Sequence, residues 1–165
     1  MSTRSMIGKI NPDGSVTAIY CHWDGYPENQ LPILVPCYSN EEKLNELIPL
    51  GSISYLEDNP NPPEGMTHTF HDPHPRTVVA YHRDRGDKWE ECKPDTYSSL
   101  DEMFDDKNNW NIEYYYLFDG DKWNLYDRDH LQYWFGCRNG EWWYLTKSVH
   151  EIEPLVDNDT LTYLY

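Results

Sequence analysis

Apolar and polar residues alternate along two short segments near the start of the chain, 6–11 and 16–23. The turn signal Pro12–Ser15 separates them, because its proline presets φ and its glycine accepts a positive φ. This alternation predicts an N-terminal β-hairpin. The segment Asp24–Pro27 ends the second strand, and a stretch punctuated by prolines follows up to Pro36.

Two segments, 40–47 and 98–106, have the spacing and the end signals of short helices. In the first, Leu44, Leu47 and Ile48 form one apolar stripe, and a serine or asparagine at its start can cap the helix. The second begins with two serines and carries acidic residues early, where the helix dipole favours them. Each segment therefore predicts one helix.

The middle of the chain is irregular. Residues 58–75 are rich in proline and histidine, and they predict a loop that is long for a compact domain and therefore either mobile or functional. The β-branched residues within 77–83 predict a strand, and 84–87 predict a turn.

The last third is aromatic and predicts paired hairpins. Segments 113–118 and 123–126 flank an Asp-Gly turn, and segments 133–137 and 141–145 flank an Asn-Gly turn. Such dipeptides between apolar runs are strong hairpin signals. Together the elements predict an α+β fold, with an antiparallel sheet of hairpins or a meander and one or two short helices. We expect a domain over 1–126 and a β-hairpin extension over 127–165 that packs on it, so that the chain forms a single domain.

Composition adds a strongly acidic character. The 165 residues include 29 acidic and 13 basic side chains, so the formal net charge is 13 − 29 = −16. This charge disfavours direct nucleic-acid binding, because phosphates would be repelled, and it favours partners with basic surfaces. Seven Trp and 14 Tyr can bury large areas, so a packed core is expected.

Other classes of protein are disfavoured by the same sequence. No apolar run is long enough to span a bilayer, so no membrane association is expected. The N-terminal residues lack the apolar region of a secretory signal, which predicts a cytoplasmic protein. The four cysteines are widely spaced, so we expect reduced thiols rather than a disulfide scaffold.

The first candidate site is the end of the second predicted strand. On a strand, Tyr20, His22 and Asp24 project to one face, and Cys21 and Trp23 project to the other. Trp23 would then pack in the core, while His22 and Asp24 form a binding or acid–base face. The alternative is a buried histidine that its neighbouring carboxylate satisfies, followed by a turn.

The second candidate is a pair of arginines in an acidic chain. If the predicted strand continues, Tyr81, Arg83 and Arg85 share one face. Arginine offers a bidentate fork to carboxylate or phosphate, which favours a ligand-binding or partner-binding role. The alternative is ion pairing with the surplus of local acids.

The third candidate is a set of histidines: His68, His71, His74 and His82. Spacings of three residues occur in metal sites, but the prolines in this segment prevent a helix that would make the side chains converge. We therefore expect a loop with solvated histidines, and we expect no metal and no cofactor.

The fourth candidate is a concentration of acidic residues. Residues 87–129 contain 13 acids and five bases, a net charge of 5 − 13 = −8. One interpretation is phosphate mimicry, in which carboxylates on a rigid scaffold occupy the nucleic-acid groove of another protein, and the other is simple solubility. The candidate partner-facing acids are Asp101, Glu102, Asp105, Asp106, Asp119 and Asp121.

Several blocks carry a resemblance that spans most of residues 3–123. They are Thr3–Gly8, Asp13–Val16, Ile19–Pro27, Leu50-Gly51 before Ser54, Thr77–Gly86 and Glu113–Phe118. With these blocks the chain resembles a widespread family of small bacteriophage and prophage proteins that has no assigned activity. The resemblance implies a phage source and action by binding. It also implies that the following residues form one surface or pocket: Arg4, Tyr20, His22, Trp23, Asp24, Tyr26, Tyr81, Arg83, Asp84 and Arg85.

One main hypothesis and two alternatives follow. The main hypothesis is a non-catalytic phage protein that inhibits a host defence or nucleic-acid-processing protein, with a basic surface as its target. The first alternative is a nucleotide-binding sponge, in which tyrosines stack the base and Arg83 or Arg85 holds the phosphate. The second is a hydrolase that uses His22 with Asp24 as general base. The sequence leaves open whether the chain forms a homodimer, and the expected location is the cytoplasm of the bacterial host.

Overall fold

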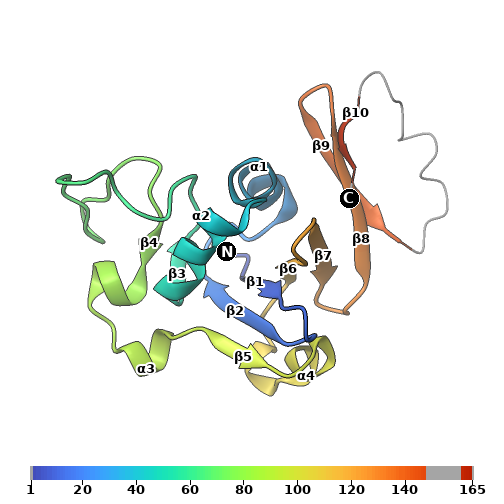
Figure 1. Ribbon diagram of the computed structural model, residues 1–165, viewed down its shortest axis with the longest axis horizontal. Helices are drawn as coiled ribbons and strands as arrows, with labels where there is room; N and C mark the ends of the chain where they lie inside the picture. Colours follow the sequence, from blue (N-terminus) through green and yellow to red (C-terminus); the bar gives the residue numbers. More distant parts are fainter. Residues whose placement is uncertain (1, 148–160, 165) are drawn as a thin grey trace.

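A computed structural model describes residues 2–147 and 161–164 (Figure 1). Its strands are β1 (Ser5–Ile10), β2 (Val16–Cys21), β3 (Ile53–Tyr55), β4 (Val79–Ala80), β5 (Asp95–Tyr97), β6 (Tyr114–Phe118), β7 (Trp123–Asp127), β8 (Gln132–Arg138), β9 (Glu141–Thr146) and β10 (Leu161–Leu164). Its α-helices are α1 (Pro27–Tyr38), α2 (Glu41–Leu47), α3 (Trp89–Cys92) and α4 (Leu100–Asp105). The described residues also form the 3-10 turns η1 (Ile48–Leu50) and η3 (Lys107–Asn109) and a π-helical turn, η2 (Tyr81–Arg85).

The strands form one mixed β-sheet. Its order is β10-β8-β7-β6-β1-β2-β3-β4, with β5 paired to β2 and β9 paired to β8. The hairpins β1–β2, β6–β7 and β8–β9 are antiparallel, as the alternation and the turn signals predicted. However, β1 pairs with β6 in parallel, and β2 pairs with β3 in parallel. The strands of each parallel pair are separated by other elements in the sequence, so no hairpin turn joins them. The α+β class is confirmed, and the sheet is mixed rather than wholly antiparallel.

Alternate residues of the central strands supply two cores, one on each face of the sheet. Ile7 of β1 and Tyr116 of β6 face one side, where α1 and α2 cover the sheet. Their neighbours Met6 and Tyr115 face the other side, where Met103 of α4 covers it. The period-2 pattern therefore sets the two-layer packing around β1, β2 and β6.

Helices α2 and α4 confirm the two helices that the sequence predicted. Asn40 caps α2 by accepting a hydrogen bond from the backbone N–H of Lys43 at 3.0 Å. Ser99 caps α4 by accepting one from the backbone N–H of Glu102 at 3.2 Å. These side chains satisfy backbone donors that a helix start leaves unpaired.

Helix α1 is not among the predicted elements, because Pro32 and Pro36 lie inside it. Each proline removes a backbone donor from the helix and crowds the preceding turn. The helix forms because Leu31, Leu34 and Tyr38 lie on one side and are fully buried against the sheet. Burial of these apolar side chains against the sheet therefore outweighs the unfavourable effect of the two prolines on the helix.

The predicted strand over 77–83 is much shorter than expected. Only Val79–Ala80 is strand, and the chain then turns into η2. The Asp84 carboxylate accepts a hydrogen bond from the backbone N–H of Ala80 at 2.7 Å, which closes the chain into this turn. The prediction that Tyr81, Arg83 and Arg85 share one strand face is therefore wrong.

The strands after residue 126 continue the same sheet. β8 pairs with β7, and Phe135 belongs to the core that also contains Ile7 and Tyr116. Tyr144 of β9 donates a hydrogen bond from its hydroxyl to Glu28 of α1 at 2.8 Å. The part of the predicted extension over 148–160 lies outside the described residues. No helix in the described ranges is long and apolar enough to cross a bilayer.

Candidate functional site

Arg4, Tyr20 and His22 form a hydrogen-bonded row at the end of β2. The Tyr20 hydroxyl oxygen accepts a hydrogen bond from Arg4 Nε at 3.0 Å and lies 2.6 Å from His22 Nδ1. Burial lowers the pKa of His22, and the positive charges of Arg4 and Arg85 lower it further. A lowered pKa favours the neutral imidazole, whose Nδ1 can accept a hydrogen bond from the Tyr20 hydroxyl.

Arg85 lies against the same region from η2. Its guanidinium carbon is 4.0 Å from the centre of the Tyr81 ring and 5.3 Å from that of Phe70. Its Nε and Nη2 donate to the two carboxylate oxygens of Asp87 at 2.6 and 2.7 Å. Of the ten residues that the resemblance implies for one surface, Arg4, Tyr20, His22, Tyr81 and Arg85 do lie together, and we call them the Arg4–Arg85 surface.

Trp23 joins this surface rather than the core. The sequence places it on the inner face of a strand, but β2 ends at Cys21, so the alternation stops before Trp23. Its side chain is 45% exposed, and its ring lies edge-on to His22 with centroids 4.8 Å apart. The prediction that Trp23 packs in the core is wrong.

Asp24 and Tyr26 are separate from His22. Asp24 is exposed, and its backbone has a left-handed φ of 56° at the turn into α1. The imidazole of His22 contacts the Tyr20 hydroxyl and not Asp24 within residues 2–147, so the His22–Asp24 pair that the hydrolase alternative needs is not formed. Tyr26 is the N-cap residue of α1 and lines a different part of the surface, described below.

Arg83 and Asp84 hold the long loop in place. Arg83 donates to the carbonyl oxygens of Pro60 and Val78 at 2.8 and 2.9 Å, and it pairs with Asp84. The Asp84 carboxylate, 3% exposed, also lies 3.3 Å from Nε2 of buried His68. These contacts connect residues 58–75 to η2. The side chains of Arg83 and Asp84 are therefore occupied by contacts within the chain.

The histidines do not converge on a metal site. His68 Nδ1 accepts the backbone N–H of His74 at 2.8 Å, and its Nε2 lies 3.0 Å from the Val78 carbonyl, so both ring nitrogens hold the loop. His71 packs edge-on to Phe70, and His82 packs against Trp89. Within the described ranges, no group of three or more His, Cys, Asp or Glu side chains is arranged to hold a metal ion.

The six candidate acids lie in two separate places and several serve local structure. Asp101, Glu102, Asp105 and Asp106 are on or just after α4, whereas Asp119 and Asp121 are in the β6–β7 turn beside Glu41 of α2. The Glu102 carboxylate accepts from Ser98, and that of Asp106 accepts from the Tyr97 hydroxyl at 2.7 Å. Asp119 accepts the backbone N–H groups of Asp121 and Lys122, both at 2.9 Å. They do not form one continuous acidic face.

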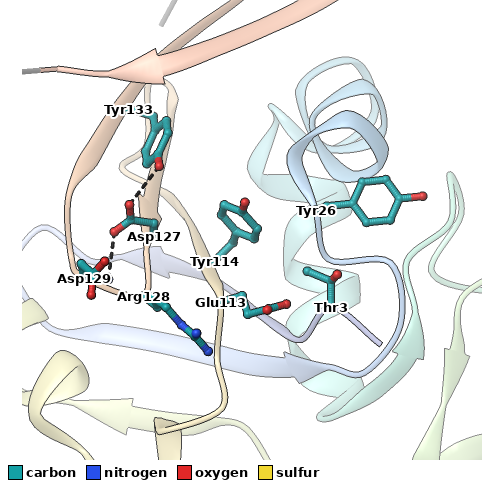
Figure 2. A pocket seen from close by; sticks show the side chains of 8 residues that line it. All are labelled: Thr3, Tyr26, Glu113, Tyr114, Asp127, Arg128, Asp129 and Tyr133. Carbon is teal, nitrogen blue, oxygen red and sulfur yellow. Dashed lines mark hydrogen bonds between the residues drawn. The ribbon is translucent and has the colours of Figure 1, made fainter. Parts of the chain in front are cut away.

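A cleft of about 330 Å³ opens where β6, β7 and β8 meet the N-terminal segment. We call it the tyrosine cleft. In Figure 2, side chains from β7, β8 and the turn between them form one side, Thr3 and Tyr26, the residue before α1, lie on the other, and the start of β6 lies between. Its lining residues are Thr3, Tyr26, Glu113, Tyr114, Asp127, Arg128, Asp129 and Tyr133.

Asp127 is the most firmly placed carboxylate in this cleft. Its Oδ1 accepts the backbone N–H groups of Asp129 and Leu131 at 2.9 and 3.0 Å, and its Oδ2 accepts the Tyr133 hydroxyl at 2.9 Å. Burial, together with the hydrogen bond and charge of Asp127, raises the pKa of Tyr133 to about 12. Burial and the negative charges of Glu28, Glu113 and Asp127 raise the pKa of Tyr114. The cleft is therefore a region of negative potential with uncharged phenols.

A second cleft of about 260 Å³ lies on the α4 side and shares Arg128 and Asp129 with the first. We call it the histidine cleft. The ring of His130 stacks on Phe104 with centroids 4.3 Å apart and an interplanar angle of 9°. Trp110 lines it and is 80% exposed, which makes it a large aromatic side chain in contact with solvent. The remaining lining residues are Asp106, Asn109, Ile112 and Tyr115.

Sequence reasoning missed most of these lining residues. Of the two clefts, only Tyr26 and Asp106 are among the predicted site residues. The available signal was the turn Asp127–Leu131, in which an aspartate that caps its own turn is followed by a charged pair. Their convergence with residues near 3 and 26 depends on the parallel pairing of β1 with β6, which the sequence pattern does not report.

Comparison with protein-family models, with curated proteins and with solved structures finds no match. The resemblance to small phage proteins therefore stays a prediction.

Proposed function

We propose that this chain is a non-catalytic binding protein, an acidic inhibitor from a bacteriophage that acts on a host defence or nucleic-acid-processing protein with a basic surface. The observation that carries the proposal is the composition of the two clefts. Their linings hold four carboxylates, those of Asp106, Glu113, Asp127 and Asp129, against the one arginine Arg128, a net charge of 1 − 4 = −3.

The aromatic residues around the clefts support a protein partner. Tyrosine, tryptophan and arginine supply most of the binding energy at protein interfaces, where they insert into or surround desolvated pockets. Tyr26, 40% exposed, borders the tyrosine cleft, and the far more exposed Trp110 borders the histidine cleft. A basic partner surface would gain both charge complementarity and aromatic contact area here.

The structure keeps one of the six predicted acids, Asp106, and adds Glu113, Asp127 and Asp129. In the sequence, the candidate acids were those of α4 and of the β6–β7 turn, and several of them cap or close local structure instead. The acids of the clefts lie around one shared pair, Arg128 and Asp129, and are therefore able to contact one partner together.

A salt-stepped affinity experiment tests the proposal. The immobilised chain is exposed to bacterial lysate at about 50 mM salt and eluted at about 500 mM, since the Debye length falls from about 14 to about 4 Å over that range. We expect a nucleic-acid-binding or defence protein to elute, and we expect its activity to fall when the purified chain is added at equal concentration. Retention that does not depend on salt, or a target whose activity is unchanged, would contradict the proposal.

The nucleotide-binding alternative is favoured by one observation, the stacking of Arg85 over Tyr81 beside Arg4 and Tyr20. An anionic ligand there has to displace Asp87, which already occupies the guanidinium fork of Arg85. Arg83 is engaged in holding the loop, so Arg85 rather than Arg83 is the residue to substitute. If nucleotides released by heat from the purified protein disappear in the R85A variant, while thermal stability is kept, the sponge replaces the inhibitor as the better function.

A further inference from the structure

We propose that the tyrosine cleft is the subsite for an arginine side chain of the partner protein. The inference rests on the proposed function and assigns a chemistry to the partner: a basic segment that inserts arginine between tyrosine rings and carboxylates. Three features of the cleft carry it, namely its charge, its aromatic walls and an internal precedent in the same chain.

The charge of the cleft is negative and is not neutralised from within. Three carboxylates, those of Glu113, Asp127 and Asp129, face one arginine, for a net charge of 1 − 3 = −2. Neither the Glu113 nor the Asp129 carboxylate has an ion-pair partner within residues 2–147, since the ion pairs of the described chain lie between Asp58 and Lys93. The Asp127 carboxylate is held by three hydrogen bonds, so it contributes a fixed negative charge to the cleft and leaves the pairing with a cation to Glu113 and Asp129.

The walls of the cleft suit a flat cation. Tyr26, Tyr114 and Tyr133 line it, and aromatic faces attract cations through the ring quadrupole. The guanidinium of arginine is planar, stacks on rings and donates two parallel hydrogen bonds to a carboxylate, whereas the ammonium of lysine is a compact, strongly hydrated charge. A cleft that combines tyrosine rings with the unpaired carboxylates of Glu113 and Asp129 therefore fits arginine better than lysine.

The chain already contains this arrangement once. Arg85 stacks 4.0 Å over the Tyr81 ring while the carboxylate of Asp87 accepts from its Nε and Nη2. There the tyrosine, the carboxylate and the arginine all belong to the protein. In the tyrosine cleft, Tyr114 and Tyr133 provide the rings, and the arginine would come from the partner. The carboxylates of Glu113 and Asp129, which have no ion-pair partner within residues 2–147, would accept from it, because Asp127 already accepts three hydrogen bonds.

Arg128 does not supply that arginine itself. It is exposed, it has no ion-pair partner within residues 2–147, and in Figure 2 its side chain extends away from Asp127 and Tyr133. It lies at the rim that the two clefts share. From there its charge weakens the attraction for a second cation.

A peptide titration tests this subsite without knowledge of the partner. The capped peptide Gly-Arg-Gly-Arg-Gly is titrated into the full chain at about 50 mM salt, beside the same peptide with citrulline or lysine in place of arginine. We expect the arginine peptide to bind about tenfold more tightly than the citrulline peptide and about threefold more tightly than the lysine peptide. Equal binding of arginine and citrulline, equal binding of arginine and lysine, or no binding of the arginine peptide would each overturn the inference.

A pair of matched variants locates the binding. The E113Q/D129N variant removes two carboxylates of the cleft whose side chains make no hydrogen bond within residues 2–147. The D101N/D105N variant removes two exposed carboxylates of α4 and changes the net charge by the same amount. We expect the first to weaken binding of the arginine peptide about tenfold and the second less than twofold. Equal losses of affinity in the two variants would mean that the peptide responds to the net charge of the protein and not to the cleft, and this result would overturn the subsite. If the double variant of the cleft does not fold, the exposed single variant D129N replaces it, with D101N as its control.

The inference and the proposed function fail separately. A partner that elutes with salt and binds E113Q/D129N as well as the wild type leaves the function standing and removes the subsite. Specific binding of the arginine peptide, with no lysate protein that elutes with salt, leaves the subsite standing and removes the inhibitor function.

Discussion

Arg83 and Arg128 are two arginines of one acidic chain, and the fold treats them in opposite ways. Arg83 donates to the carbonyl oxygens of Pro60 and Val78, to Asn61 and to Asp84. Arg128 has no ion-pair partner within residues 2–147 and lies at the rim of both clefts.

The regions around the two arginines differ in the same way. In residues 58–85, ion pairs of Asp58 with Arg76 and of Asp84 with His68 and Arg83 hold an irregular loop, in which prolines leave few backbone donors for regular structure. Around the clefts, regular strands carry most of the backbone hydrogen bonds. The carboxylate of Asp127 holds the turn between β7 and β8, whereas those of Glu113 and Asp129 have no ion-pair partner within residues 2–147. Charges that the fold does not use are the ones available to a partner.

The largest expected effect comes from Asp84. The D84A variant removes a buried carboxylate that accepts from Ala80, pairs with Arg83 and lies beside His68. Breaking a buried ion pair on one side leaves an uncompensated charge, so we expect a loss of about 3 kcal/mol in the free energy of unfolding. Urea denaturation measures it, with D129A as the control, for which a change within about 0.5 kcal/mol is expected. Similar losses for both variants would remove the distinction between the regions.

The two arginines themselves give the next effect. We expect R83Q to lower the free energy of unfolding by about 1–2 kcal/mol, because it removes hydrogen bonds that the charged guanidinium donates to Pro60 and Val78. R128Q is expected to stay within about 0.5 kcal/mol of the wild type, since its side chain is exposed. The same urea curves decide this, and a larger loss for R128Q than for R83Q would contradict the comparison.

The R128Q substitution should also change the affinity for the arginine peptide, and it should increase that affinity, whereas loss of a structural contact would decrease it. Removal of a positive charge from the rim makes the tyrosine cleft more negative, so R128Q should bind the arginine peptide about threefold more tightly than the wild type at low salt. Calorimetric titration at two salt concentrations measures the change. Weaker binding by R128Q would show that Arg128 contributes an attractive contact instead.

The smallest expected effect is the contribution of His22, on the Arg4–Arg85 surface, to the pH dependence of stability. Its pKa is lowered in the folded protein by burial and by the charges of Arg4 and Arg85. As pH falls through the unfolded value of about 6.5, the unfolded chain binds a proton that the folded chain resists, so stability falls below that pH and is unaffected well above it. NMR titration of the imidazole should give a pKa below about 6.5. In R4Q the pKa should be higher than in the wild type, and an unchanged or lower value would count against the Arg4 contribution.

Much of the fold follows from local signals in the sequence. The hairpins β1–β2, β6–β7 and β8–β9 and the capped helices α2 and α4 were predicted, because turn residues, caps and the period of the apolar positions are all local. Helix α1 was not, because burial of its apolar stripe against the sheet overrides two internal prolines.

The candidate site was harder to predict for a related reason. Tyr20, His22 and Tyr81 were singled out and do lie together with Arg85. Arg83 looked the same in the sequence, but it donates a hydrogen bond to the carbonyl oxygen of Pro60, 23 residues away, and no local sequence pattern indicates such a contact. The tyrosine cleft depends on strand pairings between distant segments, so its residues carried no shared signal.

A map of the binding surface tests most directly whether the tyrosine cleft binds arginine. Backbone amide chemical shifts are recorded while the arginine peptide is added to the isotope-labelled full chain. We expect the largest changes at 113–115 and 127–133, with little change over 58–93. Changes concentrated at 20–23 and 81–89, or spread evenly over the acidic surface, would contradict it.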